Sequence, residues 1–199
     1  MRFLLALLAC ATLARADDGW KPVGVRDGIT VEYRQVEGAP VREVRARTHS
    51  PLPAAAIRKT LWCHEEYVQF VPYLKRLDIL REDEDTKLLY EQLNVPLLKD
   101  RDVTVRVHRH LDPDTGIFEM NTEAAPDEGP PVRADYVRVR TSKSLWRLVP
   151  TADGGTDVSY ALRTDAGGLV PVWMANLAQK DATARFVRAV LERAGRNVP

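Results

Sequence analysis

The sequence predicts a single domain of the α+β class, in which a curved antiparallel β-sheet wraps around a long C-terminal α-helix. Apolar and polar residues alternate through much of residues 74–164, short turn sequences separate the alternating segments, and residues 171–196 carry apolar side chains at helical spacing. The 199 residues correspond to about one domain, at a typical ~150 residues per domain. Antiparallel strands joined by short turns form a meander, and its twist allows it to curve around a helix.

Two strands are expected first. Residues 29–34 alternate apolar and polar side chains after Asp27-Gly28, which indicates a half-buried strand. Residues 41–49 form a second candidate strand, and the Glu-Gly-Ala-Pro sequence at 37–40 is typical of a turn between them.

Two short helices are expected next. Pro53 precedes residues 54–63, whose apolar side chains recur at helical spacing. A second helix over 65–71 ends at Pro72, because proline cannot continue a helix.

Six further strands are expected in the middle of the chain, separated by acidic or glycine-containing turns. The candidate strands are 74–81, 87–95, 102–110, 117–124, 136–149 (straight or bent) and 156–164.

The last element is a long helix that starts at Pro171 and runs to about Arg196. On a helical wheel a narrow apolar stripe is predicted to face the core, and a charged side is predicted to face solvent. The stripe contains Trp173, Leu177, Ala184, Val187 and Leu191, and the charged side contains Asp181, Arg185, Arg188 and Glu192.

Alternation also predicts which strand residues point inward. On the strand 102–110, Val103, Val105 and Val107 share one face. These side chains are either plain core or the wall of a ligand cavity, because a sheet folded around one helix leaves an interior that side chains do not necessarily fill. The other inward candidates are Phe118 with Met120, Trp146 with Leu148, and Val158 with Tyr160 and Leu162.

The first sixteen residues predict a secretory signal. A positive start at Arg2 precedes an apolar run over 3–13, and Ala14-Arg15-Ala16 gives a small-x-small pattern before Asp17. The expectation is cleavage after Ala16, a domain over 17–199 and an exported protein, periplasmic or secreted. The alternative is a lipoprotein signal with a lipidated Cys10, for which the apolar region is short. The run is too short for a spanning helix, which needs about 20 residues.

Composition limits the function further. Cleavage would remove two arginines and leave 27 basic and 28 acidic residues, so no basic excess points to nucleic acid as a partner. Cys63 would be the only remaining cysteine, so no internal disulfide is possible. Cys63 beside His64 could be a nucleophile, but sequence neighbours on a helix point about 100° apart. A small buried hydrophobic residue is the favoured interpretation.

Three stretches resemble the START domain family. They are Leu89-Tyr90 through Arg101-Asp102, residues 144–160 from Ser-Leu-Trp to Ser-Tyr, and residues 165–176 before and into the last helix. The resemblance implies a helix-grip fold and a non-enzymatic domain that encloses one lipid, often a sterol, phospholipid or sphingolipid, and carries it between membranes. It also implies a lid made of the loop with Pro96, Leu97 and Leu98 and of the helix side with Trp173, Met174 and Leu177.

One position departs from the family pattern. Some sterol-binding members have a basic residue six positions after the arginine of Arg-Asp, where this chain has Val107. The neighbouring Arg106 points to the other face of the strand, because a one-residue shift changes face. Neither a buried acid–base pair nor sterol specificity is therefore carried over.

Lys180 falls inside the apolar stripe of the last helix, between Leu177 and Ala184. A charge there is costly unless it is paired or its stem reaches water. Three interpretations are open: the helix kinks, the ammonium meets solvent at a cavity opening, or Lys180 pairs with the headgroup of an anionic lipid.

Catalytic, metal and cofactor motifs are not found. His108 and His110 share a strand face but lack a third ligand at useful spacing, and the acidic turns at 83–85 and 112–114 lack EF-hand spacing. Gly-x-Ser-x-Gly, the P-loop and Gly-x-Gly-x-x-Gly are also missing. We expect no catalytic residues, no metal and no cofactor.

The leading hypothesis is a monomeric lipid carrier that binds one lipid or other hydrophobic ligand, makes transient membrane contact and does not bind nucleic acid. One alternative is a cyclase- or hydrolase-like enzyme on the same architecture, since a fold does not determine function. The other is an envelope interaction protein with a filled core and no ligand.

Overall fold

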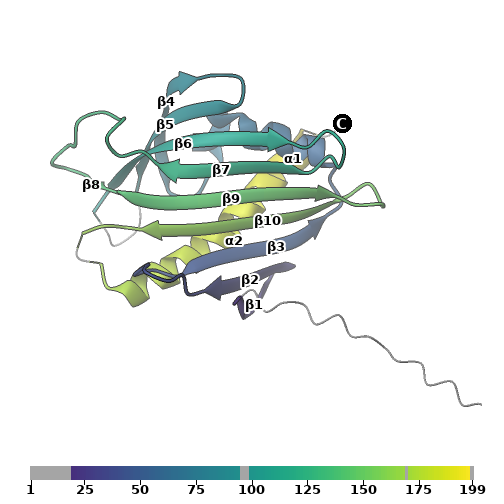
Figure 1. The fold of residues 1–199 in the computed structure, drawn as a ribbon, viewed down its shortest axis with the longest axis horizontal. Helices are drawn as coiled ribbons and strands as arrows, with labels where there is room; N and C mark the ends of the chain where they lie inside the picture. The colour runs from purple at the N-terminus through teal and green to yellow at the C-terminus, as the bar shows by residue number, and fades with distance from the viewer. Residues whose placement is uncertain (1–18, 95–98, 169, 198–199) are drawn as a thin grey trace, which may run out of the picture.

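The computed structural model describes residues 19–94, 99–168 and 170–197. Within these residues one large antiparallel sheet and a long C-terminal helix form the α+β architecture that the sequence predicts (Figure 1). The predicted signal segment 1–16 lies outside the described residues.

Nine strands lie side by side in the sheet, and consecutive strands mostly pair as neighbours. Their order is β1 (Lys21–Arg26), β2 (Ile29–Arg34), β3 (Glu43–Ser50), β10 (Thr156–Asp165), β9 (Thr141–Pro150), β7 (Phe118–Ala124), β6 (Arg101–Leu111), β5 (Thr86–Leu93) and β4 (Leu74–Glu82). The main exception to this neighbour pairing is β3 with β10, which places an early strand of the chain beside the last one. The short β8 (Val137–Arg138) pairs in parallel with the end of β6.

Three helices accompany the sheet. The helix α1 (Ala54–Trp62) and the 3₁₀ helix η1 (His64–Gln69) lie at one end, and α2 (Val172–Arg196) runs across one face of the sheet (Figure 1). α2 packs against β10, β3, β2 and α1. No described helix is long and apolar enough to cross a membrane.

The sequence misses one strand and merges two others. β1 has no alternating pattern, because all six of its residues are exposed, and it pairs with β2 only at the sheet edge with an irregularity between Pro22 and Gly24. The single strand predicted over 136–149 is divided into β8 and β9. The chain turns there because Arg138 points into a buried ion pair with Asp102 on β6.

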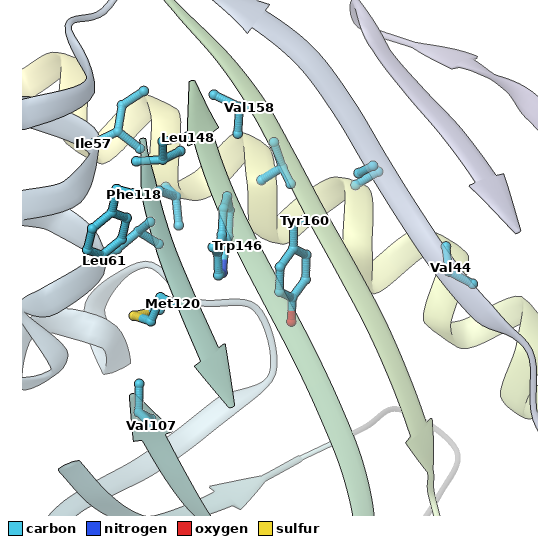
Figure 2. Close-up of a cluster of buried hydrophobic side chains, with 14 of the residues drawn as sticks. Val44, Ile57, Leu61, Val107, Phe118, Met120, Trp146, Leu148, Val158 and Tyr160 are labelled. Atoms are coloured by element: carbon cyan, nitrogen blue, oxygen red, sulfur yellow. The ribbon is translucent and has the colours of Figure 1, made fainter. Parts of the chain in front are cut away.

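The core occupies the half of the inner face that lies under α1 and the C-terminal part of α2. Phe118, Trp146 and Leu148 are almost completely buried there, beside Ile57 and Leu61 of α1 (Figure 2).

Aromatic stacking fixes the inner edge of this core. Trp146 stacks on Tyr160 with 4.5 Å between ring centroids, and Phe186 of α2 meets these two rings edge-on at 5.3 and 5.2 Å. Such offset and edge-on pairs add about 0.5–1.5 kcal/mol each beyond burial.

A polar network covers the outer face of β5 and β6. Arg138 donates two hydrogen bonds to the Asp102 carboxylate, at 2.9 and 2.7 Å, and two more to the carbonyls of Pro126 and Pro130 at 3.0 Å. Tyr90 donates to the same carboxylate at 2.9 Å. Burial raises the pKa of Asp102, but the hydrogen bonds from Arg138 and Tyr90 outweigh burial and hold that pKa below its usual value. The network therefore fastens the segment before β8 to the sheet.

Replacing Arg138 with Met should destabilise the protein by about 3 kcal/mol or more, because it leaves the buried Asp102 carboxylate without its counter-charge. Urea unfolding at neutral pH measures this loss. The matched control is Arg133→Met, since Arg133 pairs with Asp135 on the surface and its loss should change the unfolding midpoint little. Equal losses in the two variants would contradict the structural role of the buried pair.

Candidate functional site

A cavity of about 410 Å³ lies between the inner face of the sheet and α2. Sites that hold one small molecule typically have volumes of about 300–1,000 Å³, and the volume of this cavity lies in that range. β5, β6, β7, β9 and β10 form one wall, α2 forms the opposite wall, and η1 with residues 71–73 closes one side. Most of the wall is apolar. The presence of this cavity shows that side chains do not fill the whole space between the sheet and α2.

The structure divides the predicted inward strand residues into two groups. Val103, Val105, Val107, Met120, Tyr160 and Leu162 line the cavity. Phe118, Trp146, Leu148 and Val158 are buried in the adjacent core and do not line it (Figure 2). Alternation places all ten on the inner face, but it contains no information on which end of that face stays open.

The predicted orientation of the last helix is wrong in its N-terminal half. Trp173 and Leu177 were expected to face inward, yet they are 66% and 61% exposed and do not line the cavity. Met174 is partly buried and also lies off the cavity wall. The wheel follows the largest apolar side chains, whereas the cavity-lining residues in the first half of α2 are alanines and polar residues. The α2 residues that line the cavity are Ala175, Ala178, Gln179, Asp181, Ala182 and Phe186.

Lys180 does not reach the cavity. Its ammonium lies 5.5 Å from the centre of the Tyr33 ring, so it points toward β2. α2 is continuous from Val172 to Arg196, so the helix is not interrupted at Lys180. The interpretation of Lys180 as a headgroup ligand is incompatible with this position. Pro96, Leu97 and Leu98, the predicted lid loop, lie outside the described residues.

The cavity contains an acidic side chain that the sequence analysis missed. Glu91 lines the cavity from β5, between Leu89 and Leu93 on the same face and opposite Val103 of β6. Burial raises the pKa of Glu91 to about 7. Within the described residues its carboxylate has no hydrogen bond or ion pair. The signal was present in the sequence, because a glutamate interrupts the apolar face Leu89–Leu93 of a predicted strand.

The other ionisable residues of the wall are neutral or already bonded. Burial, with the nearby charge of Lys87, lowers the pKa of His64 to about 3, so this imidazole is neutral, and its Nδ1 lies 3.2 Å from the Trp62 carbonyl oxygen. Asp181 pairs with Arg26 at 3.1 Å and with Arg185 at 2.6 Å. Arg101 donates to the carbonyls of Lys99 and Ala166.

One buried amide has a free donor. Gln179, 6% exposed, accepts a hydrogen bond from the Thr164 amide at 2.9 Å through Oε1, while its Nε2 has no partner among the described residues. A buried donor without a partner costs about 1–3 kcal/mol. Among the polar side chains that line the cavity, Glu91 therefore stands out as a carboxyl without a partner in the described residues, and Gln179 as an amide that is only half bonded.

Neither of the weaker sequence candidates forms a reactive site. Cys63 is half-buried rather than buried, and burial with the charges of Glu66 and Glu65 raises the pKa of its thiol, the opposite of an activated cysteine. His108 and His110 lie exposed on β6. The described residues include no group of three or more potential metal ligands.

The stability of the protein should decrease as the pH rises through the range in which Glu91 ionises. The folded-state pKa of about 7 is above the ordinary 4.5, so the unfolded chain releases this proton first and ionisation favours unfolding. Relative to Glu91→Gln, the native protein should lose about 2–3 kcal/mol between pH 5 and pH 8. Urea unfolding at a series of pH values measures the difference, and parallel pH profiles of the two proteins would contradict the burial of this carboxyl.

Comparison with known proteins supplies the family. The family model for the START domain matches residues 8–199. An uncharacterized protein of Pseudomonas aeruginosa is 26% identical over 192 residues, which cover 94% of each chain.

Three solved structures have a similar fold. A STAR-related lipid transfer protein of Xanthomonas axonopodis is 29% identical with a TM-score of 0.81, covering 89% of this chain and 99% of that one. Human StAR-related lipid transfer protein 5 superposes with a TM-score of 0.80 at 15% identity, covering 92% and 89% of the two chains. The ZhuI aromatase/cyclase of a Streptomyces species has a TM-score of 0.58 at 18% identity, covering 79% and 96%. The family match over almost the whole chain, on a long helix laid against a large antiparallel sheet, shows that this protein belongs to the START domain family.

Proposed function

We propose that this protein binds a single lipid or other hydrophobic ligand in the cavity and carries it between membranes as a monomer, without chemical change. The observation that carries the proposal is the apolar cavity of about 410 Å³ under α2 in a START domain. Removing ~400 Å² of lipid tail from water at about 25 cal/mol/Å² contributes about 10 kcal/mol before entropic costs. This is sufficient for a carrier.

The exposed apolar side chains of α2 support membrane contact. Val172, Trp173 and Leu177 are 47%, 66% and 61% exposed within the first two turns of the helix. Ala175 and Ala178 line the cavity from the same two turns. Tryptophan favours the boundary between water and lipid because its ring is apolar and its N–H is polar. A bilayer touching this surface would therefore lie next to the helix that covers the ligand.

The N-terminal sequence supports export. A short apolar run after a positive start and a small-x-small pattern ending at Ala16 are typical of a secretory signal. We propose cleavage after Ala16 and a periplasmic or secreted location, where the protein could exchange lipid with envelope membranes.

One observation favours a second candidate function, an enzyme that acts on a hydrophobic substrate. Glu91 is a carboxyl group in a cavity with a pKa of about 7, and such groups are suited to proton transfer near neutral pH. The neutral His64 and the hydrogen-bonded Tyr67 provide no evident second member of an acid–base pair. Carriage without turnover is therefore the preferred proposal.

Native mass spectrometry of the exported protein, purified from its own cells without delipidation, tests the cargo and the processing together. The expected species is a chain that begins at Asp17 with one hydrophobic molecule bound. A chain that begins at a lipid-modified Cys10 would contradict the processing. Incubating the delipidated protein with the identified molecule should restore the complex at unchanged ligand mass, whereas a product of different mass would favour the enzyme.

The double variant Trp173→Ala, Leu177→Ser should weaken binding to lipid vesicles at least about tenfold, because each buried apolar side chain contributes about 1.5–3 kcal/mol. Vesicle sedimentation and the rate of lipid transfer between vesicles measure the effect. The unfolding free energy should stay within about 1 kcal/mol, as for surface positions. Val25→Ser is the matched control, since Val25 is 71% exposed on β1. Equal loss in both proteins, or none, would contradict the membrane surface.

A further inference from the structure

Glu91 is an acidic group on the cavity wall whose neighbours on its own strand face are apolar. Leu89 and Leu93 flank it on β5, and Val103 lies opposite it on β6. Burial raises the pKa of Glu91, and no ion pair joins its carboxylate to a charged side chain of the described residues. A carboxyl in such a place is costly to ionise unless a cation accompanies it.

The cations near this wall are engaged elsewhere. Arg101 donates to the backbone carbonyls of Lys99 and Ala166. The buried Lys87 donates to the Trp62 carbonyl at 3.1 Å and pairs with Glu82 at 2.9 Å. His64 remains neutral because its pKa is lowered to about 3.

The remaining titratable groups on the wall do not neutralise Glu91 either. The Asp181 carboxylate forms ion pairs with Arg26 and Arg185, and the Tyr73 hydroxyl oxygen lies 3.5 Å from its Oδ2. The Tyr67 hydroxyl donates to the Leu61 carbonyl at 2.7 Å, and burial raises the pKa of Tyr160, so both phenols stay neutral. Within the described residues, Glu91 is the carboxyl of the cavity that no positive charge accompanies.

We propose that the ligand is a lipophilic amine, an apolar body with one basic nitrogen whose ammonium group pairs with Glu91 inside the cavity. The proposal rests on the proposed function, because it requires that the cavity accept a hydrophobic molecule. The ammonium supplies a counter-charge to Glu91, which forms no ion pair with Arg101 or another cation of the described residues. Charge-assisted hydrogen bonds are the strong ones.

The test uses three probes with the same twelve-carbon chain: dodecylamine, dodecanol and dodecanoic acid. Isothermal titration at pH 7, below the concentration at which each probe self-associates, should give the order amine tighter than alcohol and alcohol tighter than acid. Glu91→Gln should weaken amine binding about 10–100-fold. Alcohol binding should change less than about threefold, and binding of the acid should improve because the repelling carboxylate is removed.

Glu123→Gln is the matched control. It removes a carboxylate from the exposed side of β7, where Glu123 pairs with Lys143 at 2.7 Å. All three affinities should stay as in the native protein. A loss of amine affinity in this variant equal to that in Glu91→Gln would assign the preference to net charge and overturn the proposal.

Two further outcomes are decisive. Equal affinities of the native protein for amine and alcohol, or equal weakening of both in Glu91→Gln, would overturn the amine proposal while leaving the hydrophobic carrier intact. Failure of every probe to bind, dodecanol included, would overturn the carrier proposal itself. Glu91→Leu provides a second variant if Glu91→Gln folds poorly, and it should lose the amine preference in the same way.

Discussion

The central constraint on this structure is that one long helix, with only the short α1 and η1 beside it, covers the inner face of a sheet of nine adjacent strands. α2 succeeds where aromatic and aliphatic side chains reach between the layers, as Phe186 does against Trp146 and Tyr160. Toward its N-terminus the helix lines the cavity with the short side chains of Ala175, Ala178 and Ala182, among others. The cavity therefore lies where many of the side chains on the helix are short, next to the packed aromatic end.

Consecutive residues of β5 differ in whether their polar side chains have hydrogen-bond partners. Tyr90 and Gln92 point to the outer face, where Tyr90 donates to Asp102, Gln92 donates to Tyr90, and Gln92 in turn accepts from Tyr136. Glu91, between them, points to the inner face and has no partner in the described residues. Buried polar groups with all their hydrogen bonds made stabilise a fold. A buried polar group without a hydrogen-bond partner destabilises it, and such groups are found most often at functional sites. The contrast separates the bonded network on the outer face of β5 from the unpaired carboxyl on its inner face.

The sequence predicts the architecture well because alternation and turn chemistry are local. The strands β4 to β10 and both ends of α2 lie within a few residues of their expected positions, apart from the division at Arg138. The orientation of α2 is not local. Trp173 and Leu177 are apolar and helically spaced, yet nothing in the wheel shows that Ala175 and Ala178 line the cavity in their place. Glu91 is not predicted for a different reason. Apolar residues define the inward face of a strand, and this criterion assigns no role to a charged residue that interrupts such a face.

The outermost described strands, β1 and β4, determine how this sheet meets other protein molecules. A free edge can pair with a strand of another chain and seed aggregation. β1 carries Pro22, which has no N–H to donate, and its register shifts before Gly24. β4 shifts register twice and exposes Lys75, Arg76 and Arg81. Interrupted and charged edges are poor templates for such pairing, so the two outer strands of this open sheet carry features that oppose edge-to-edge association.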